Sequence, residues 1–387
     1  MSLRLLFLTA SFIGGVAFAQ SRLKPDINAE TPEGKLLQEI GQTQEDAKRL
    51  ELVDKFLAAY GSHNSVPWAI GQALASAQKL NQHDKVMADA AKLLAVDASD
   101  AEMAYAGLQA AAAKSDADQT IKWANSTIES CQKTAASPEP KDEAELERWK
   151  YKISFCKPEQ TPKRAEYELV TLMARSQEPA ARVKLLDALA ALNPKSEYLA
   201  QAPTYYFTSY RQMNQNEKAL AVATKAAESQ TADEDMLLML ANNAFEKKDQ
   251  PGAIKYADQI TALLQSKPLP AGMDQAAWDK KKGQTLGAGL WLKGMTLAGQ
   301  SKWKETDSTL REALPHLQGG NTELLSHALF NVGLANYKMG NLNDALKFMQ
   351  DCAAFKGSKQ AEAVKNAAVI RQQGGGAPAP KKAGGKK

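Results

Sequence analysis

Apolar residues recur at every third or fourth position in several segments, as they do on one face of an α-helix. The stretches YYFTSYRQM from Tyr205 and ALFNVGLANY from Ala328 show this spacing clearly. The turns after them, Asn214-Gln215 and Gly340-Asn341, are short enough to join only antiparallel neighbours. The pattern predicts an all-α protein of about eighteen helices in about nine antiparallel pairs. The low content of β-branched residues, 11 Val and 10 Ile in 387 residues, argues against a sheet-rich fold.

The body of the chain contains an internal duplication. Residues 36–124 align without a gap on residues 169–257, with about 24 identities, mostly at small or apolar positions. A shorter period of 34 residues lies inside each copy, for example from Val86 to Thr120. A unit of this length built from two amphipathic helices cannot bury its apolar face alone, so neighbouring units are expected to stack.

The unit from Ala328 to Ala353 resembles the tetratricopeptide repeat (TPR) family point by point. Gly333 is the small residue where the first helix is closely crossed, and Tyr337 is the bulky residue one turn later. Ala345 begins the close contact of the second helix, whose face continues through Phe348 and Cys352. Looser units of the same kind are Tyr205–Ser229, Leu238–Ile260 and Gly289–Leu314. The resemblance covers about residues 33–371 and implies a right-handed superhelical solenoid with a concave groove.

Composition changes along the chain divide it into predicted segments. The proline-containing stretch between the duplicated halves is the expected junction, and a second irregularity surrounds Pro268 and Pro270. We expect a signal peptide at residues 1–19 and a first repeat unit at residues 33–135. A junction at 136–161 is expected to lead to a second repeat unit at 162–267. C-terminal repeats at 274–371 and a disordered tail at 374–387 follow.

The N-terminal segment predicts export. Arg4 precedes an apolar run that is shorter than a membrane-spanning helix, and Ala17-Phe18-Ala19 forms a small-x-small cleavage site before Gln20. We expect a periplasmic or secreted protein cleaved near Ala19-Gln20, with a retained membrane anchor as the alternative.

The net charge of +4 comes from the two ends of the chain. Without Arg4 and the four lysines of the C-terminal tail, the remaining chain is close to neutral, so nucleic acid is not an expected partner. The tail is expected to be disordered, either as a solubilising segment or as a weak contact to an anionic surface through Lys381, Lys382, Lys386 and Lys387.

Three cysteines cannot all pair within one molecule. Cys131 and Cys156 flank the predicted junction and could form a disulfide if two helices fold back on each other. Cys352 falls on an apolar helix face and is expected to be a buried small hydrophobic residue.

The sequence contains no recognised catalytic, cofactor or metal motif. Its four histidines are scattered, and the glycine-rich run from Gly283 to Gly289 follows no predicted strand, as a phosphate-binding loop would require. We therefore expect no enzyme activity, no cofactor and no metal. Trp149 and Trp278 lie outside the matched units and are candidates for exposed aromatic contacts.

The TPR resemblance implies that a protein or peptide partner binds in the groove lined by the first helix of each pair. Leu238 stands where a carboxylate clamp would need lysine, so such a clamp is not expected. The predicted function is an exported, non-enzymatic interaction scaffold. The alternatives are an envelope-associated assembly factor tethered by its tail, and a subunit of an enzyme complex. The groove positions on the matching repeats are Thr204, Thr208, Arg211, Leu238, Asn242, Phe245, Phe330, Leu334 and Tyr337.

Overall fold

A computed structural model describes residues 25, 27–374 and 376. This part of the chain is helical and contains no strand, which confirms the predicted all-α class. It divides into two compact units, one ending at Asn214 and one beginning at Gln215. The predicted signal peptide and nearly all of the predicted tail lie outside the described residues.

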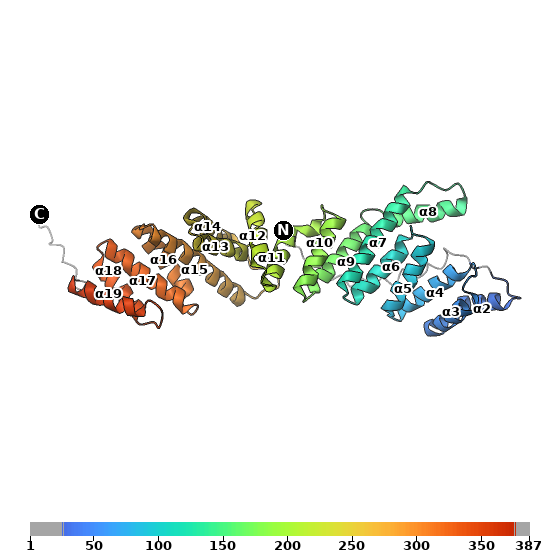
Figure 1. Ribbon diagram of the computed structural model, residues 1–387, viewed down its shortest axis with the longest axis horizontal. Helices are drawn as coiled ribbons and strands as arrows, with labels where there is room; N and C mark the ends of the chain where they lie inside the picture. Colours follow the sequence, from blue (N-terminus) through green and yellow to red (C-terminus); the bar gives the residue numbers. More distant parts are fainter. Residues whose placement is uncertain (1–24, 26, 375, 377–387) are drawn as a thin grey trace. The chain divides into compact units, whose positions relative to one another are not determined.

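Helix pairs build the N-terminal unit. The pairs α2–α3, α4–α5, α6–α7 and α9–α10 each pack together, α5 packs on α6 and α7 on α9 (Figure 1). The first helices α6 and α9 also touch, as do the second helices α7 and α10. The helices are α2 (Pro32–Gln42), α3 (Asp46–Tyr60), α4 (Val66–Lys79), α5 (His83–Val96), α6 (Ala101–Ala113), α7 (Ala117–Ala136), α8 (Glu143–Phe155), α9 (Thr161–Arg175), α10 (Pro179–Leu192), a 3-10 turn (Glu197–Gln201) and α11 (Ala202–Gln212).

The C-terminal unit follows the same plan. The pairs α13–α14, α15–α16 and α17–α18 stack in chain order, α12 packs on α13, and α19 packs on α18. The first helix α13 contacts α15, and α15 contacts α17, so the three first helices form one face of the unit. The helices are α12 (Asn216–Glu228), α13 (Glu234–Glu246), α14 (Gln250–Ser266), α15 (Gln275–Gly299), α16 (Trp303–Leu317), α17 (Thr322–Lys338), α18 (Leu342–Ala353) and α19 (Gln360–Gln372).

One turn geometry joins the two helices of most pairs. Three residues separate α4 from α5, and the middle one, Asn81, has a positive φ of 54°. Ser115, Lys248, Ser301 and Gly340 hold the same place in other pairs, with φ between 57° and 80°. A single left-handed residue ends the first helix and reverses the chain, which forces the second helix back along the first.

The duplication is visible in the helix ends and their caps. α6 and α13 occupy equivalent positions in the two copies, and both have 13 residues. Asp100 caps α6 by accepting a bond from the backbone N–H of Met103, and Asp233 caps α13 in the same way. Aspartate caps at equivalent positions also begin α7 and α14. The identities between the copies therefore include the residues that begin helices.

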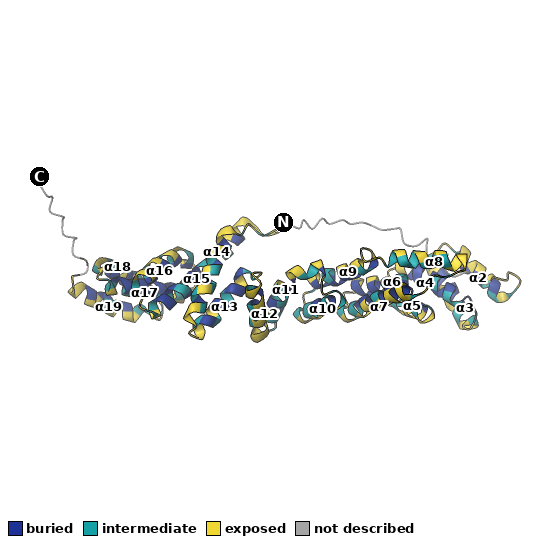
Figure 2. Ribbon diagram, turned by 90° about the horizontal axis from the view of Figure 1, so that it is seen from above, coloured by how far each residue is buried: buried dark blue, intermediate teal, exposed yellow. Residues whose placement is uncertain are grey.

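Small residues set the close approach of helices within a pair, as the repeat pattern predicts. A Cβ added at Gly294 on α15 would lie 2.4 Å from Leu310 of α16, and one at Gly333 would lie 3.1 Å from Met349 of α18. Ala345 of α18, the helix that packs against Gly333, is fully buried. Each unit buries its apolar side chains between packed helices and leaves its polar faces open (Figure 2).

The segment 136–161 lies inside the N-terminal unit. Cys131 of α7 and Cys156 after α8 form a disulfide with a Cα–Cα distance of 5.2 Å, so the pairing that the sequence left open is made. Lys152 of α8 also binds Asp97 at 2.5 Å. Helix α8 contributes no buried residue, and these cross-links hold it against α6 and α7.

Cys352 is the third cysteine. It is fully buried and unpaired, as expected, and its thiol donates to the backbone oxygen of Ser326 at 3.3 Å.

The prediction for Trp278 was wrong. Its side chain is 3% exposed and packs with Ile260 and Leu264, with the Lys267 ammonium 5.7 Å from its ring. Trp149 is half-buried and donates its indole N–H to Ser137 at 2.9 Å. Neither side chain is the open aromatic contact that its position outside the matched repeats suggested.

Candidate functional site

The predicted groove residues belong to both units. Thr204, Thr208 and Arg211 lie on α11 of the N-terminal unit, where Thr204 and Arg211 are exposed. The Thr208 hydroxyl donates back to the carbonyl of Thr204 at 2.9 Å, as threonines in helices commonly do. The other six lie on α13 and α17 of the C-terminal unit.

On α13 and α17 most of these side chains are half-buried. Leu238, Phe245, Leu334 and Tyr337 each pack partly against the core of the C-terminal unit. Asn242 is exposed and donates to Glu246 at 2.7 Å.

Phe330 differs from the rest. It is only 5% exposed and packs in the core, and the Lys359 ammonium lies 4.9 Å from its ring. The loop before α19 therefore covers this member of the predicted groove.

An aromatic row crosses the first-helix face of the C-terminal unit. Phe245 on α13 lies 5.8 Å from Trp291 on α15, and Trp291 lies 6.3 Å from His327 on α17 (ring centroids). We call these three residues the aromatic row. All three are half-buried, so each ring keeps an accessible part. Three successive helix pairs thus contribute one ring each to a continuous strip.

Trp291 is the residue that the sequence analysis missed. Its Nε1 is buried and has no hydrogen-bond partner among the described residues. A buried donor without an acceptor costs about 1–3 kcal/mol relative to a satisfied one. The signal was present in the sequence, because Leu238, Trp291 and Phe330 each stand three residues before the small residue of their first helix.

Charged residues at the start of α13 are held in ion pairs. Glu234 at the start of α13 is 3% exposed and binds Lys281 of α15 at 2.9 Å and also Lys267. Lys281 reaches Asp235 as well, at 2.8 Å. Burial raises the pKa of Glu234, but the hydrogen bonds from Lys267 and Lys281 outweigh burial and place the pKa below its ordinary value. These ion pairs fasten α13 to α15 and to the segment that follows α14.

A serine, a histidine and a glutamate meet next to the row. His327 Nε2 lies 2.9 Å from Ser358 Oγ, and this hydroxyl donates to Glu323 Oε2 at 2.8 Å. In a catalytic triad the carboxylate orients the imidazole through its other nitrogen, while the serine faces the substrate. Here the carboxylate accepts the serine proton directly, and the Ser358 backbone N–H binds it too. The arrangement anchors the loop before α19 to α17 and does not activate a nucleophile.

The described residues contain no group of three or more His, Cys, Asp or Glu side chains placed to hold a metal ion. Over that same part of the chain, no helix combines the length and apolar character needed to cross a bilayer.

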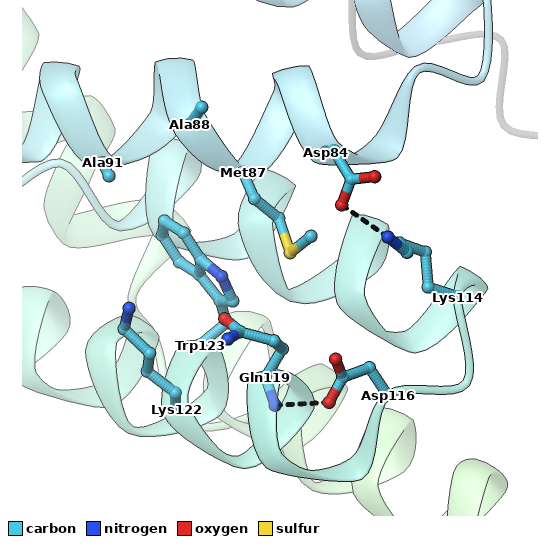
Figure 3. A pocket seen from close by; sticks show the side chains of 9 residues that line it. All are labelled: Asp84, Met87, Ala88, Ala91, Lys114, Asp116, Gln119, Lys122 and Trp123. Atoms are coloured by element: carbon cyan, nitrogen blue, oxygen red, sulfur yellow. Dashed lines mark hydrogen bonds and ion pairs between the residues drawn. The ribbon is translucent and has the colours of Figure 1, made fainter.

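A pocket of about 330 Å³ lies in the N-terminal unit between α5 and the start of α7 (Figure 3). Met87, Ala88 and Ala91 of α5 form its apolar side. Trp123 of α7 rises toward them; it is 3% exposed, yet its Nε1 has no hydrogen-bond partner among the described residues. Gln119, Lys122, Asp116, Lys114 and Asp84 complete the lining.

Comparisons with known proteins return structural similarity only. No family model matches the sequence, and no curated protein matches it. The TPR domain of P58(IPK) is 12% identical over 89% of this chain and 99% of that chain, with a TM-score of 0.27. Cut9–Hcn1 of the APC/C is 11% identical over 89% and 91%, with a TM-score of 0.28, and yeast Tom70 is 9% identical over 89% and 97%, with a TM-score of 0.23. The stacked helix pairs described above are themselves TPR-like, as the sequence predicts.

Proposed function

We propose that this protein is an exported, non-enzymatic scaffold that binds an extended segment of a protein partner on the face of α13, α15 and α17. The observation that carries the proposal is the aromatic row with the unpartnered indole N–H of Trp291 at its centre.

The row offers two kinds of interaction to a peptide. Half-exposed rings supply apolar area at a low entropic cost, which is why aromatic residues dominate binding hot spots. The Trp291 N–H is buried, so a backbone carbonyl of the partner can accept from it only after a rotation of the ring, and that bond would recover the cost of its burial. An extended segment presents a carbonyl at every residue, whereas a folded surface has most of its carbonyls already bonded.

The disulfide supports the exported location. Cys131 and Cys156 are paired, and structural disulfides persist in oxidising compartments such as the periplasm or the extracellular space. Thiol alkylation of the denatured protein from native cells tests this point, because denaturation exposes the buried Cys352. One reactive thiol per chain without reductant agrees with export, and three would contradict it.

Site-specific photo-crosslinking in the native compartment tests the binding face. A photoreactive amino acid placed at Leu238 or Leu334 should capture one partner segment, identified by mass spectrometry. The same amino acid at Lys304 on the second helix α16 is the matched control and should not capture it. Equal capture from both positions would contradict the proposed face.

The captured segment then provides a quantitative test. Its synthetic peptide should bind Trp291→Phe about tenfold more weakly than the unchanged protein, because this substitution keeps an aromatic ring but removes the indole donor and part of the ring area. Trp303→Phe at the start of α16 is the control and should bind normally. Unchanged affinity in Trp291→Phe would refute the role of the indole N–H.

The envelope tether is a separate proposal. It rests on the lysine-rich tail and predicts that deletion of residues 374–387 moves the protein from the membrane or wall fraction to the soluble fraction at low salt. An unchanged distribution would exclude it.

A further inference from the structure

We infer that the pocket between α5 and α7 is a second binding site, which takes a carboxylate carried on a short apolar stem. The pocket belongs to the N-terminal unit and is independent of the aromatic row.

The donors in the pocket define the charged end of the ligand. Trp123 Nε1 is buried and unpartnered, and an indole nitrogen can only donate. In Figure 3 this nitrogen lies on the side of the ring that faces Met87 and Gln119. Lys122 is exposed, and its ammonium lies 5.9 Å from the centroid of the same ring. A carboxylate beside Trp123 could accept from the indole and from the Gln119 amide. The exposed Lys122 lies on the other side of the ring in Figure 3 and would reach the carboxylate by a change of rotamer.

The two aspartates of the pocket are both engaged by donors, which reduces their repulsion of an anion. Asp84 binds the Lys114 ammonium at 2.5 Å. Asp116 caps α7 by accepting from the backbone N–H of Gln119 at 3.0 Å. Lys122 forms no ion pair with any described residue and is the cation left to a ligand.

The opposite wall defines the rest of the ligand. Met87, Ala88 and Ala91 present hydrocarbon from α5, and methionine adapts to stems of different shape. The volume of about 330 Å³ is at the lower end of the range for small-molecule sites. A carboxylate with a few methylene groups fits this space, whether it comes from a small free acid or from an acidic side chain of a peptide.

The duplication provides an internal comparison. The second copy keeps the scaffold of the pocket, since Lys255 lies 5.3 Å from the centroid of the Tyr256 ring as Lys122 does near Trp123. It replaces Trp123 by Tyr256 and Gln119 by Gly252, so both neutral donors are exchanged. The donor set is therefore particular to the first copy.

The indole N–H signals of the full chain give a direct test. Protein labelled with ¹⁵N at its six tryptophan indoles should give six resolvable signals, and Trp123→Phe identifies the one from Trp123 while the other five report an intact fold. The probes are pentanoate and an acetylated, amidated hexapeptide with one central glutamate. The controls are pentanamide and the same hexapeptide with glutamine.

A carboxylate probe should shift the Trp123 signal saturably, and its neutral control should not. Lys122→Met should weaken binding about tenfold, whereas the matched variant Lys255→Met should leave it unchanged. A stronger response to the hexapeptide assigns the carboxylate to a peptide side chain, and a response to pentanoate alone assigns it to a small acid. The inference is overturned if neither carboxylate moves the signal, if the neutral controls move it equally, or if Lys122→Met binds as well as the unchanged protein.

Discussion

Two serines at equivalent positions of the duplication should respond in opposite ways to the same substitution. Ser76 on α4 and Ser209 on α11 are both fully buried. The Ser76 hydroxyl donates to Asp46 at 2.9 Å and accepts from Arg49 at 3.0 Å. In the second copy Asp46 is replaced by Pro179, and Ser209 Oγ is buried without a partner among the described residues. The duplication has kept the serine and lost its acceptor.

The magnitudes follow from these contacts. Ser76→Ala removes hydrogen bonds to two charged groups and leaves Asp46 and Arg49 less well satisfied in the interior, which should cost about 1.5–3 kcal/mol. Ser209→Ala removes a hydroxyl that already carries its desolvation cost, so stability should stay unchanged or increase by about 1 kcal/mol. The two variants should therefore differ by about 1.5–4 kcal/mol.

Hydrogen exchange is the suitable assay, because a stacked repeat protein need not unfold in one step. Amide protection in α3 and α4 should fall in Ser76→Ala, and protection in α10 and α11 should hold or rise in Ser209→Ala. Urea unfolding followed by circular dichroism shows whether each variant raises or lowers the stability of the whole protein. A loss of protection in Ser209→Ala equal to that in Ser76→Ala would refute the argument from the missing acceptor.

Three further predictions concern stability. The pKa of Glu234 lies below its ordinary value of 4.5, so its stabilising contribution is present above that pH and is lost as the pH falls through the lowered pKa. Glu234→Gln should therefore weaken the acid dependence of amide hydrogen-exchange protection in the C-terminal unit. An unchanged dependence would contradict this. Replacing Cys131 and Cys156 by serine opens a loop with a sequence separation of 25 and should cost about 3.5 kcal/mol in urea unfolding, whereas no loss would contradict the loop-closure argument. Gly71→Ala places its new Cβ in open space and should stabilise α4 by about 0.5–1 kcal/mol. Gly107→Ala places a Cβ 2.4 Å from the Trp123 ring and should lower the melting temperature. A rise in the melting temperature of both variants would be the opposing result.

The repeat architecture could be predicted from the sequence because its determinants are local. Apolar spacing, small residues such as Gly333 and Ala345, and the turn at Gly340-Asn341 each act within one helix pair. The duplication strengthened the prediction, since two independent stretches of sequence repeat the same caps and turns. Local determinants of this kind fix how a pair forms and which face it buries.

Contacts between pairs were harder to predict. Trp278 precedes the matched part of α15, so the repeat register did not indicate that its ring packs beside Lys267 and Leu264. Phe330 is correctly placed on the first helix of its pair, but the loop before α19, outside that pair, covers it. The disulfide between Cys131 and Cys156 likewise depends on how α8 returns to α7, which helical spacing does not determine.

The differences between the two copies lie where function is expected to lie. The copies share the caps Asp100 and Asp233, which are needed for any such pair to fold. On the first-helix face, Tyr105 of the first copy corresponds to Leu238 of the second, and burial, with the nearby Glu168 carboxylate, raises the pKa of Tyr105 to about 12. The aromatic row takes Phe245 from the second copy, where the first copy has Ala112, and its other two rings lie on α15 and α17 beyond the duplicated segment. The positions that begin helices are thus kept while positions on the first-helix face change, which supports the proposed binding role over a purely structural one.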